Sequence, residues 1–146
     1  MDNQNLKFDF VFLGQSVLKY QVPLDIFTTI NQIYEQNYHN LERANGQLVG
    51  KIENEHSLFY HGKDQTKMKN HNMFPQNVTD YFMSIFNHYL TFNKIRDYDT
   101  HLNSIWVNEM KQHEYNPAHI HRGMLFTGLS SVMILKLPST FGKEYS

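Results

Sequence analysis

Two histidines separated by one residue, His119 and His121, are the side chains whose types and spacing most directly suggest chemistry. On an extended segment, residues i and i+2 point to the same side of the backbone, so both imidazoles can reach one metal ion. Neutral imidazole is a ligand for iron, zinc, copper and nickel. The pair therefore predicts two ligands of a metal site, provided that the backbone is extended.

The residues before the pair favour that backbone. Pro117 fixes its own φ angle and biases Asn116 away from helix. Taken alone, His-x-His is a weak pattern, because surface loops contain it by chance. The alternative is a pair of solvated histidines, one of them bonded to a backbone carbonyl.

The flanking residues carry a family resemblance. The pattern consists of Trp106-x-Asn108, then Glu114-Tyr115-Asn116-Pro117-x-His119-x-His121-x-Gly123, then Leu129-Ser130-x-Val132-x-Ile134-x-x-Leu137-Pro138. It resembles a small family of 2-oxoglutarate/Fe(II)-dependent oxygenases that is often encoded by phages and is similar to prolyl hydroxylases. The resemblance also touches Leu48–Ile52 and the N-terminal strand and helix, so it covers most of the chain, but only residues 104–138 are specific.

The resemblance implies a double-stranded β-helix, a jelly-roll barrel of about eight strands, preceded by helices that buttress the sheet. It implies a dioxygenase that binds Fe(II) through three protein ligands and uses 2-oxoglutarate as cosubstrate. His119 and His121 are then the expected metal ligands. Asn108, on the strand before them, is the expected contact to 2-oxoglutarate; a strand-edge hydrogen bond is its alternative role.

Two features depart from the family pattern. The family usually has Asp or Glu where this chain has His121, so a neutral ligand replaces a carboxylate. The third ligand and the arginine that pairs with 2-oxoglutarate normally lie downstream, but no histidine follows His121 and no arginine follows Arg122. The chain thus reads as the first part of such a domain, with His101 and His113 as the nearest upstream substitutes for the third ligand.

Two other functions fit the same residues. A non-catalytic jelly-roll module for binding or structure fits the missing downstream histidine and arginine, since a fold does not guarantee a function. A cupin-like metal protein that does not use 2-oxoglutarate also begins its metal site with His-x-His. No residue specifies the substrate, whether a small molecule or a protein side chain.

The composition suits one domain over residues 1–146. The 13 Lys and Arg nearly balance the 14 Asp and Glu, so nucleic-acid binding is not expected. There is no cysteine, which excludes disulfides and thiolate metal sites. The N-terminus has no signal-peptide pattern, and no stretch reaches ~18 apolar residues. We therefore expect a cytoplasmic protein, in the host cytoplasm if the chain is phage-encoded, that does not span a membrane.

Hydrophobic spacing predicts the elements that must position the histidines. It predicts strands at 7–13 and 17–20, helices from 24 to 37 and after Pro75, a loop or short strand at 54–59, and strands at 104–110 and 130–137. Helices before strands favour an α+β fold, with a helical part over about 1–100 and the barrel starting at about 104–146.

Three side chains near the histidines have expected environments. Trp106 is expected in the core, because a single tryptophan is usually well buried. Glu109 and Glu114 are expected to be solvated charges.

Overall fold

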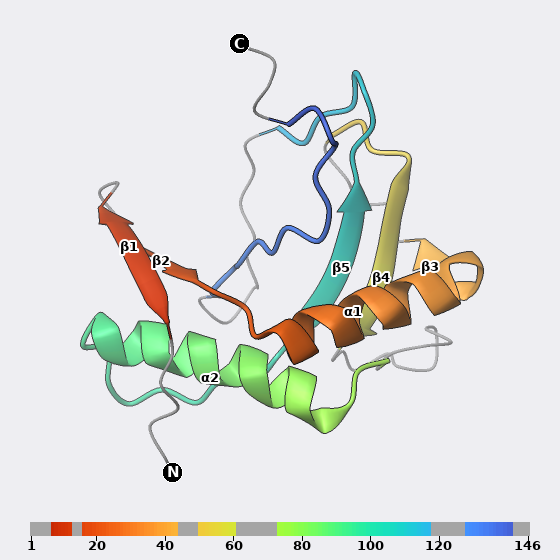
Figure 1. Ribbon diagram of the computed structural model, residues 1–146. Coiled ribbons are helices and arrows are strands. Elements are labelled where there is room, and N and C mark those ends of the chain that lie inside the picture. Colours follow the sequence, from red (N-terminus) through yellow and green to blue (C-terminus); the bar gives the residue numbers. More distant parts are fainter. Residues whose placement is uncertain (1–6, 13–15, 44–49, 61–72, 118–127, 142–146) are drawn as a thin grey trace.

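The computed structural model describes residues 7–12, 16–43, 50–60, 73–117 and 128–141. Its elements, in chain order, are β1 (Phe8–Phe12), β2 (Ser16–Tyr20), α1 (Leu24–Asn37), η1 (Tyr38–Asn40), β3 (Glu42–Arg43), β4 (Asn54–Tyr60), α2 (Gln76–Phe92) and β5 (Ser104–Glu109). The predicted α+β class is confirmed. The described strands form two antiparallel sheets, β1–β2 and β3–β4–β5, and these do not close into a jelly roll (Figure 1).

Helix α1 has the predicted bounds. Pro23 directly precedes it, and Asp25 lies in its first turn, where a carboxylate interacts favourably with the helix dipole. Its buried residues are Ile26, Ile30 and Tyr34, which follow one another at intervals of four and so form a single stripe. That stripe faces the core.

Helix α2 also carries the predicted stripe. It begins after Pro75, and its buried residues are Val78, Tyr81, Phe82, Ile85 and Leu90. Together with α1, β4 and the loops, it forms one cluster of buried residues: Ile26, Ile30, Tyr34, Leu41, Leu58, Phe74, Val78, Tyr81, Phe82 and Ile85. The expectation that the α2 stripe is core is confirmed.

Residues 54–60 form strand β4, which settles the choice left open for 54–59. β4 lies between β3 and β5, and its side chains alternate between the two faces of the sheet from Asn54 to Leu58, with a register shift between Ser57 and Phe59. Leu58 faces the core, and the half-buried Ile105 and Val107 of β5 pack against the same cluster. The helices therefore cover one face of the β3–β4–β5 sheet (Figure 1).

Two expectations are wrong. Residues 130–137 form no strand, because this segment pairs with no other described backbone. Trp106 is 36% exposed and does not belong to the core, because it lies between Ile105 and Val107 and so points to the other face of β5. The part over about 1–100 contains both helices and also strands β1 to β4.

Candidate functional site

The face of the sheet turned away from the helices is polar. In the β4–β5 ladder Asn108 lies directly opposite Glu55, and Trp106 lies opposite Ser57. Glu55 is 7% exposed and Ser57 is 6% exposed, so these polar side chains are buried. We call Glu55, Ser57, Trp106 and Asn108 the polar face.

Asn108, the expected contact to 2-oxoglutarate, has an unsatisfied oxygen. Its Oδ1 is buried and has no hydrogen-bond partner among the residues that the structure describes. A buried acceptor without a partner loses hydration and gains nothing in return, at a cost of about 1–3 kcal/mol. The alternative role of a strand-edge hydrogen bond does not account for this oxygen.

His119 and His121, the expected metal ligands, lie outside the described residues. The segment that leads to them is described as far as Pro117. Lys51 N donates to Tyr115 O at 2.9 Å, and Tyr115 N donates to Lys51 O at 3.1 Å, which forms an isolated antiparallel bridge. The chain that enters the histidine pair is therefore fixed to the residues before β4.

Gly50 allows this close approach. A Cβ atom at position 50 would lie 2.8 Å from Pro117 Cδ and 3.0 Å from Asn116 Cα, closer than side chains tolerate. Gly50 and Lys51 belong to the earlier segment, Leu48–Ile52, that the family resemblance touched. Two segments that are distant in the sequence thus meet at the residues that directly precede His119 along the chain.

Glu114 holds the same connection from its other side. Its Oε2 accepts a hydrogen bond from Lys111 N at 2.7 Å and its Oε1 accepts one from Glu53 N at 3.1 Å. The bond from Lys111 N, followed by that from Glu53 N and by the charges of Lys111 and Lys51, keeps the pKa of the Glu114 carboxyl below its usual value. Glu114 is half-buried and both of its bonds are exposed, so it remains a charge at the surface that also binds two backbone N–H groups.

The helix-covered face carries a second polar group, which the sequence analysis missed. Tyr34 Oη lies 3.2 Å from His56 Nδ1, within hydrogen-bond distance. Tyr38 Oη donates to Glu109 Oε2 at 3.0 Å, and Asn54 Nδ2 donates to the same oxygen at 3.1 Å. We call these five residues the buried network. Glu109 is half-buried and accepts both bonds, so the expectation of a solvated charge is wrong for this residue.

Burial controls protonation in the buried network. His56 is 4% exposed, and desolvation of its charged form lowers the pKa of the imidazole. Burial first, and then Glu109, raise the pKa of Tyr34, whereas the hydrogen bond to Glu109 is the main cause that raises the pKa of Tyr38. The network therefore holds a neutral imidazole and two neutral phenols at neutral pH. It joins α1 to β4 through Tyr34 and His56, and η1 to β5 through Tyr38 and Glu109.

One signal for the buried network was present in the sequence. Tyr34 and Tyr38 are four residues apart, which places them on one side of a helix, and Asn54, His56 and Leu58 alternate as strand residues on one face do. Their meeting could not be read from this spacing, because it depends on how α1 crosses the sheet.

The other histidines that the structure describes form no metal site. His101 and His113, the substitutes considered for a third ligand, are both exposed. His88 Nδ1 lies 2.7 Å from Tyr20 Oη, and its ring packs against Phe8 with the centroids 4.8 Å apart. Within the described ranges, no group of three or more histidine or acidic side chains could hold a metal ion.

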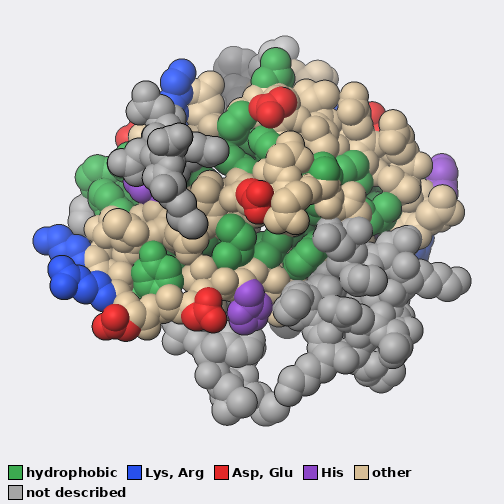
Figure 2. All heavy atoms as spheres, turned by 90° about the horizontal axis from the view of Figure 1, so that it is seen from below, with side chains coloured by type: hydrophobic (Ala, Val, Ile, Leu, Met, Phe, Trp, Pro, Cys, Tyr) green, Lys and Arg blue, Asp and Glu red, His purple; other side chains and the backbone are tan. Residues whose placement is uncertain are grey.

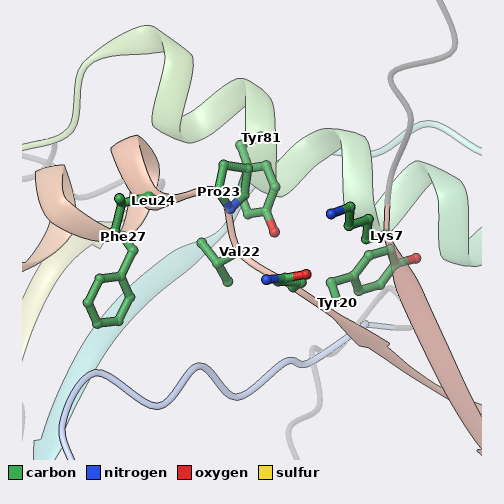
Figure 3. A pocket seen from close by; sticks show the side chains of 8 residues that line it. Lys7, Tyr20, Val22, Pro23, Leu24, Phe27 and Tyr81 are labelled. Carbon is green, nitrogen blue, oxygen red and sulfur yellow. The ribbon is translucent and has the colours of Figure 1, made fainter.

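An open groove lies away from the polar face, between α2 and the start of α1 (Figure 3). Its volume is about 440 Å³. The residues that line it are Lys7, Tyr20, Gln21, Val22, Pro23, Leu24, Phe27 and Tyr81. None of them comes from β3, β4 or β5, and Tyr20 Oη is already bonded to Ile85 O at 3.3 Å and to His88. The groove therefore shares no residue with the polar face.

The surface charges are dispersed. On the face seen in Figure 2, acidic side chains are scattered among hydrophobic and neutral groups, and basic side chains lie at the margin. None of the helices in the described part of the chain is both long and apolar enough to cross a membrane.

Comparison with known proteins returns no relative. No protein-family model, curated protein or solved structure matches this chain. The contacts described above are therefore the structural support for a function.

Proposed function

We propose that this chain is an Fe(II)/2-oxoglutarate-dependent dioxygenase, or a part of one. In this proposal His119 and His121 are two of the metal ligands, and Asn108 contacts 2-oxoglutarate. The observation that carries the proposal is the buried, unpaired Oδ1 of Asn108 on the polar face. Binding of a polar ligand at this position would account for the burial of the oxygen.

The chemistry of the donor set fits this cosubstrate. A carboxamide can exchange the places of its oxygen and nitrogen by a half-turn, and the Nδ2 group is a double N–H donor. A carboxylate of 2-oxoglutarate can accept a hydrogen bond from an N–H donor at the unpaired position. Neutral imidazoles at His119 and His121 are suitable ligands for Fe(II).

The arrangement of the sheet supports a barrel as the fuller fold. Helices cover one face of the β3–β4–β5 sheet, as buttressing helices would cover the outside of a jelly roll. Asn108, Glu55 and Ser57 lie on the opposite face, where the interior of such a barrel would be. In the proposed fold, the β3–β4–β5 sheet would be one part of a double-stranded β-helix in the fuller domain.

Each described part would have a limited role. Iron, when bound, supplies the activation of dioxygen. The bridge between Lys51 and Tyr115 and the bonds of Glu114 hold the chain that enters His119, which orients the ligands. Asn108 would orient the cosubstrate. The substrate is a small molecule or a protein side chain, and the proposed location is the cytoplasm.

Anaerobic titration tests the proposal. We expect that adding Fe(II) and 2-oxoglutarate to the full chain produces a weak visible charge-transfer band. His119→Ala should abolish the band, whereas His113→Ala, at an exposed histidine, should leave it intact. If the wild-type chain gives no band, or if His119→Ala keeps it, the proposal is wrong.

Two further measurements separate the alternatives. Production of succinate above a control without protein would exclude a non-catalytic module. Elemental analysis after mild purification distinguishes the cupin-like alternative, because nickel or manganese in place of iron would favour it.

A further inference from the structure

The middle of the segment 129–137, residues 132–136, has the burial pattern of a strand. Met133 and Leu135 are half-buried and pack against the core. Val132 and Ile134, which alternate with them, are 92% and 60% exposed. This period of two residues is that of an extended chain with one side on the protein and the other in solvent. In Figure 1 the segment is drawn as coil, in blue.

The backbone of this segment has no partner within the described ranges. The backbone hydrogen bond closest to it runs from Phe141 N to Pro138 O at 2.9 Å, beyond its end. Unpaired N–H and C=O groups on an extended segment are a template for pairing with another chain. Leu129 and Leu137, at the two ends, are also 40% and 46% exposed. Both the main chain and several apolar side chains are therefore open to a partner.

We propose that residues 129–137 pair antiparallel with the same segment of a second copy of this chain, forming a two-fold symmetric dimer. In such an interface each residue i contacts residue j of the partner, and j contacts i. The register that we infer is centred on Met133, so that Val132 lies opposite Ile134 and Leu129 lies opposite Leu137.

The sequence of the segment matches itself in this register. On the outer side two Val132–Ile134 pairs form an apolar centre, and Lys136 lies opposite Ser130. Cross-strand apolar pairs stabilise a sheet, whereas like charges directly opposite one another destabilise it. This register has no such repulsion.

Other registers also place residues of the same face opposite one another, but their cross-strand pairs are less favourable. Centring on Ile134 places Lys136 opposite Val132, and centring on Lys136 places two lysines opposite each other. Centring on Val132 places Ser130 opposite Ile134. On the outer side, which carries residues 130, 132, 134 and 136, the register centred on Met133 pairs apolar with apolar and polar with polar, and the other registers do not. The dimer uses neither His119, His121 nor Asn108, so it does not depend on the proposed function.

Sedimentation velocity of the full chain over a wide range of concentration tests the dimer. We expect a monomer–dimer equilibrium. Ile134→Lys introduces a charge opposite Val132 twice, because of the symmetry, and should raise the dissociation constant about tenfold or more. Val11→Lys is the matched control, because Val11 is 55% exposed on the separate β1–β2 sheet and should leave the equilibrium unchanged. A chain that stays monomeric overturns the proposal, including where the segment binds a different protein.

Cysteine cross-linking tests the register. The chain has no cysteine, so Val132→Cys and Ile134→Cys each introduce a single thiol. Directly opposite strand residues can bring their Cβ atoms within disulfide distance. A mixture of the two variants should therefore form disulfide-linked dimers faster than either variant alone. A dimer in which the mixture is no faster than the single variants would contradict the inferred pairing.

Discussion

The polar groups on the two faces of the β3–β4–β5 sheet differ in their hydrogen bonding. On the helix-covered face, Asn54 Nδ2 donates to Glu109 Oε2, and Tyr34 Oη lies against His56 Nδ1. On the polar face, Asn108 Oδ1 is buried and has no partner within the described part of the chain. Both asparagines lie on neighbouring strands of one sheet, so the difference does not come from residue type or from the kind of element.

This difference separates two roles for buried polarity. Groups that satisfy one another, as in the buried network, stabilise the packing of α1 on the sheet and need nothing from outside. A group that is buried and unpaired costs stability unless a ligand or another part of the protein meets it. The comparison therefore assigns the buried network to structure and supports the proposal that the polar face binds a ligand.

The strongest way to disturb the helix-covered face is to remove its apolar support. Leu58→Ala, at a side chain with 0% exposure, should lower the free energy of unfolding by about 2–5 kcal/mol, because it removes buried methyl groups and leaves a cavity. Urea denaturation followed by circular dichroism measures this loss. Val132→Ala, at a 92% exposed side chain, should change the stability of the monomer little; equal effects would mean that Leu58 is not at the centre of the core.

A single hydroxyl tests the buried network. Tyr34→Phe keeps the ring but leaves His56 Nδ1 without its partner, which should cost about 1–3 kcal/mol. The control is Tyr98→Phe, because the exposed Tyr98 hydroxyl makes only long contacts of 3.4 and 3.5 Å. If the two variants have the same stability, the network is not a structural unit.

The network also predicts a pH dependence. Burial lowers the pKa of His56 in the folded state, so below its ordinary value of about 6.5 the unfolded chain binds more protons than the folded one. The contribution of neutral His56 is therefore fully present above that pH and is lost as the pH falls below it. Thermal unfolding between pH 7 and pH 5 should show this fall in stability.

A variant assigns the pH effect to one residue. His56→Gln should remove part of the slope between pH 7 and pH 5, whereas His113→Asn should leave it unchanged. His113 is exposed and has a φ of 68°, a conformation that asparagine tolerates. An unchanged slope in His56→Gln would show that another group titrates.

The smallest effect on stability is expected at the polar face. Asn54→Ala should cost about 1 kcal/mol through the lost bond to Glu109, whereas Asn108→Ala should cost less, because removal of the unpaired oxygen offsets the packing that is lost. In contrast, Asn108→Ala should weaken the binding of 2-oxoglutarate, measured as the concentration that half-saturates the visible band. The comparison fails if Asn54→Ala weakens this binding as much as Asn108→Ala does.

Local patterns in the sequence predicted several elements correctly. The bounds of α1 followed from the apolar spacing that begins at Ile26, after Pro23, and the α2 stripe followed from the same period after Pro75. The alternation of Ile105, Trp106 and Val107 predicted strand β5, but not which side would face the core. The expected burial of Trp106 was therefore wrong, because composition alone does not choose the face of a strand.

The candidate site was only partly predictable. Asn108 was identified from the resemblance, and its unpaired oxygen became visible only in the sheet. The role of Glu114 depends on the turn that brings Lys111 N and Glu53 N to its two oxygens. His119 and His121 remain predictions, because they lie outside the described residues.

The sequence by itself determined the class of the fold, the two amphipathic helices and the absence of thiolate chemistry, because these follow from the types and spacing of residues along the chain. Only the tertiary structure decided which polar groups are paired. The partners in the buried network are up to 71 residues apart, as Tyr38 and Glu109 are, and their contact depends on how α1 packs on β4 and β5. Likewise, residues 130–137 have the sequence pattern of a strand but form none in the structure. A strand needs a paired neighbour, and that is a property of the assembled fold.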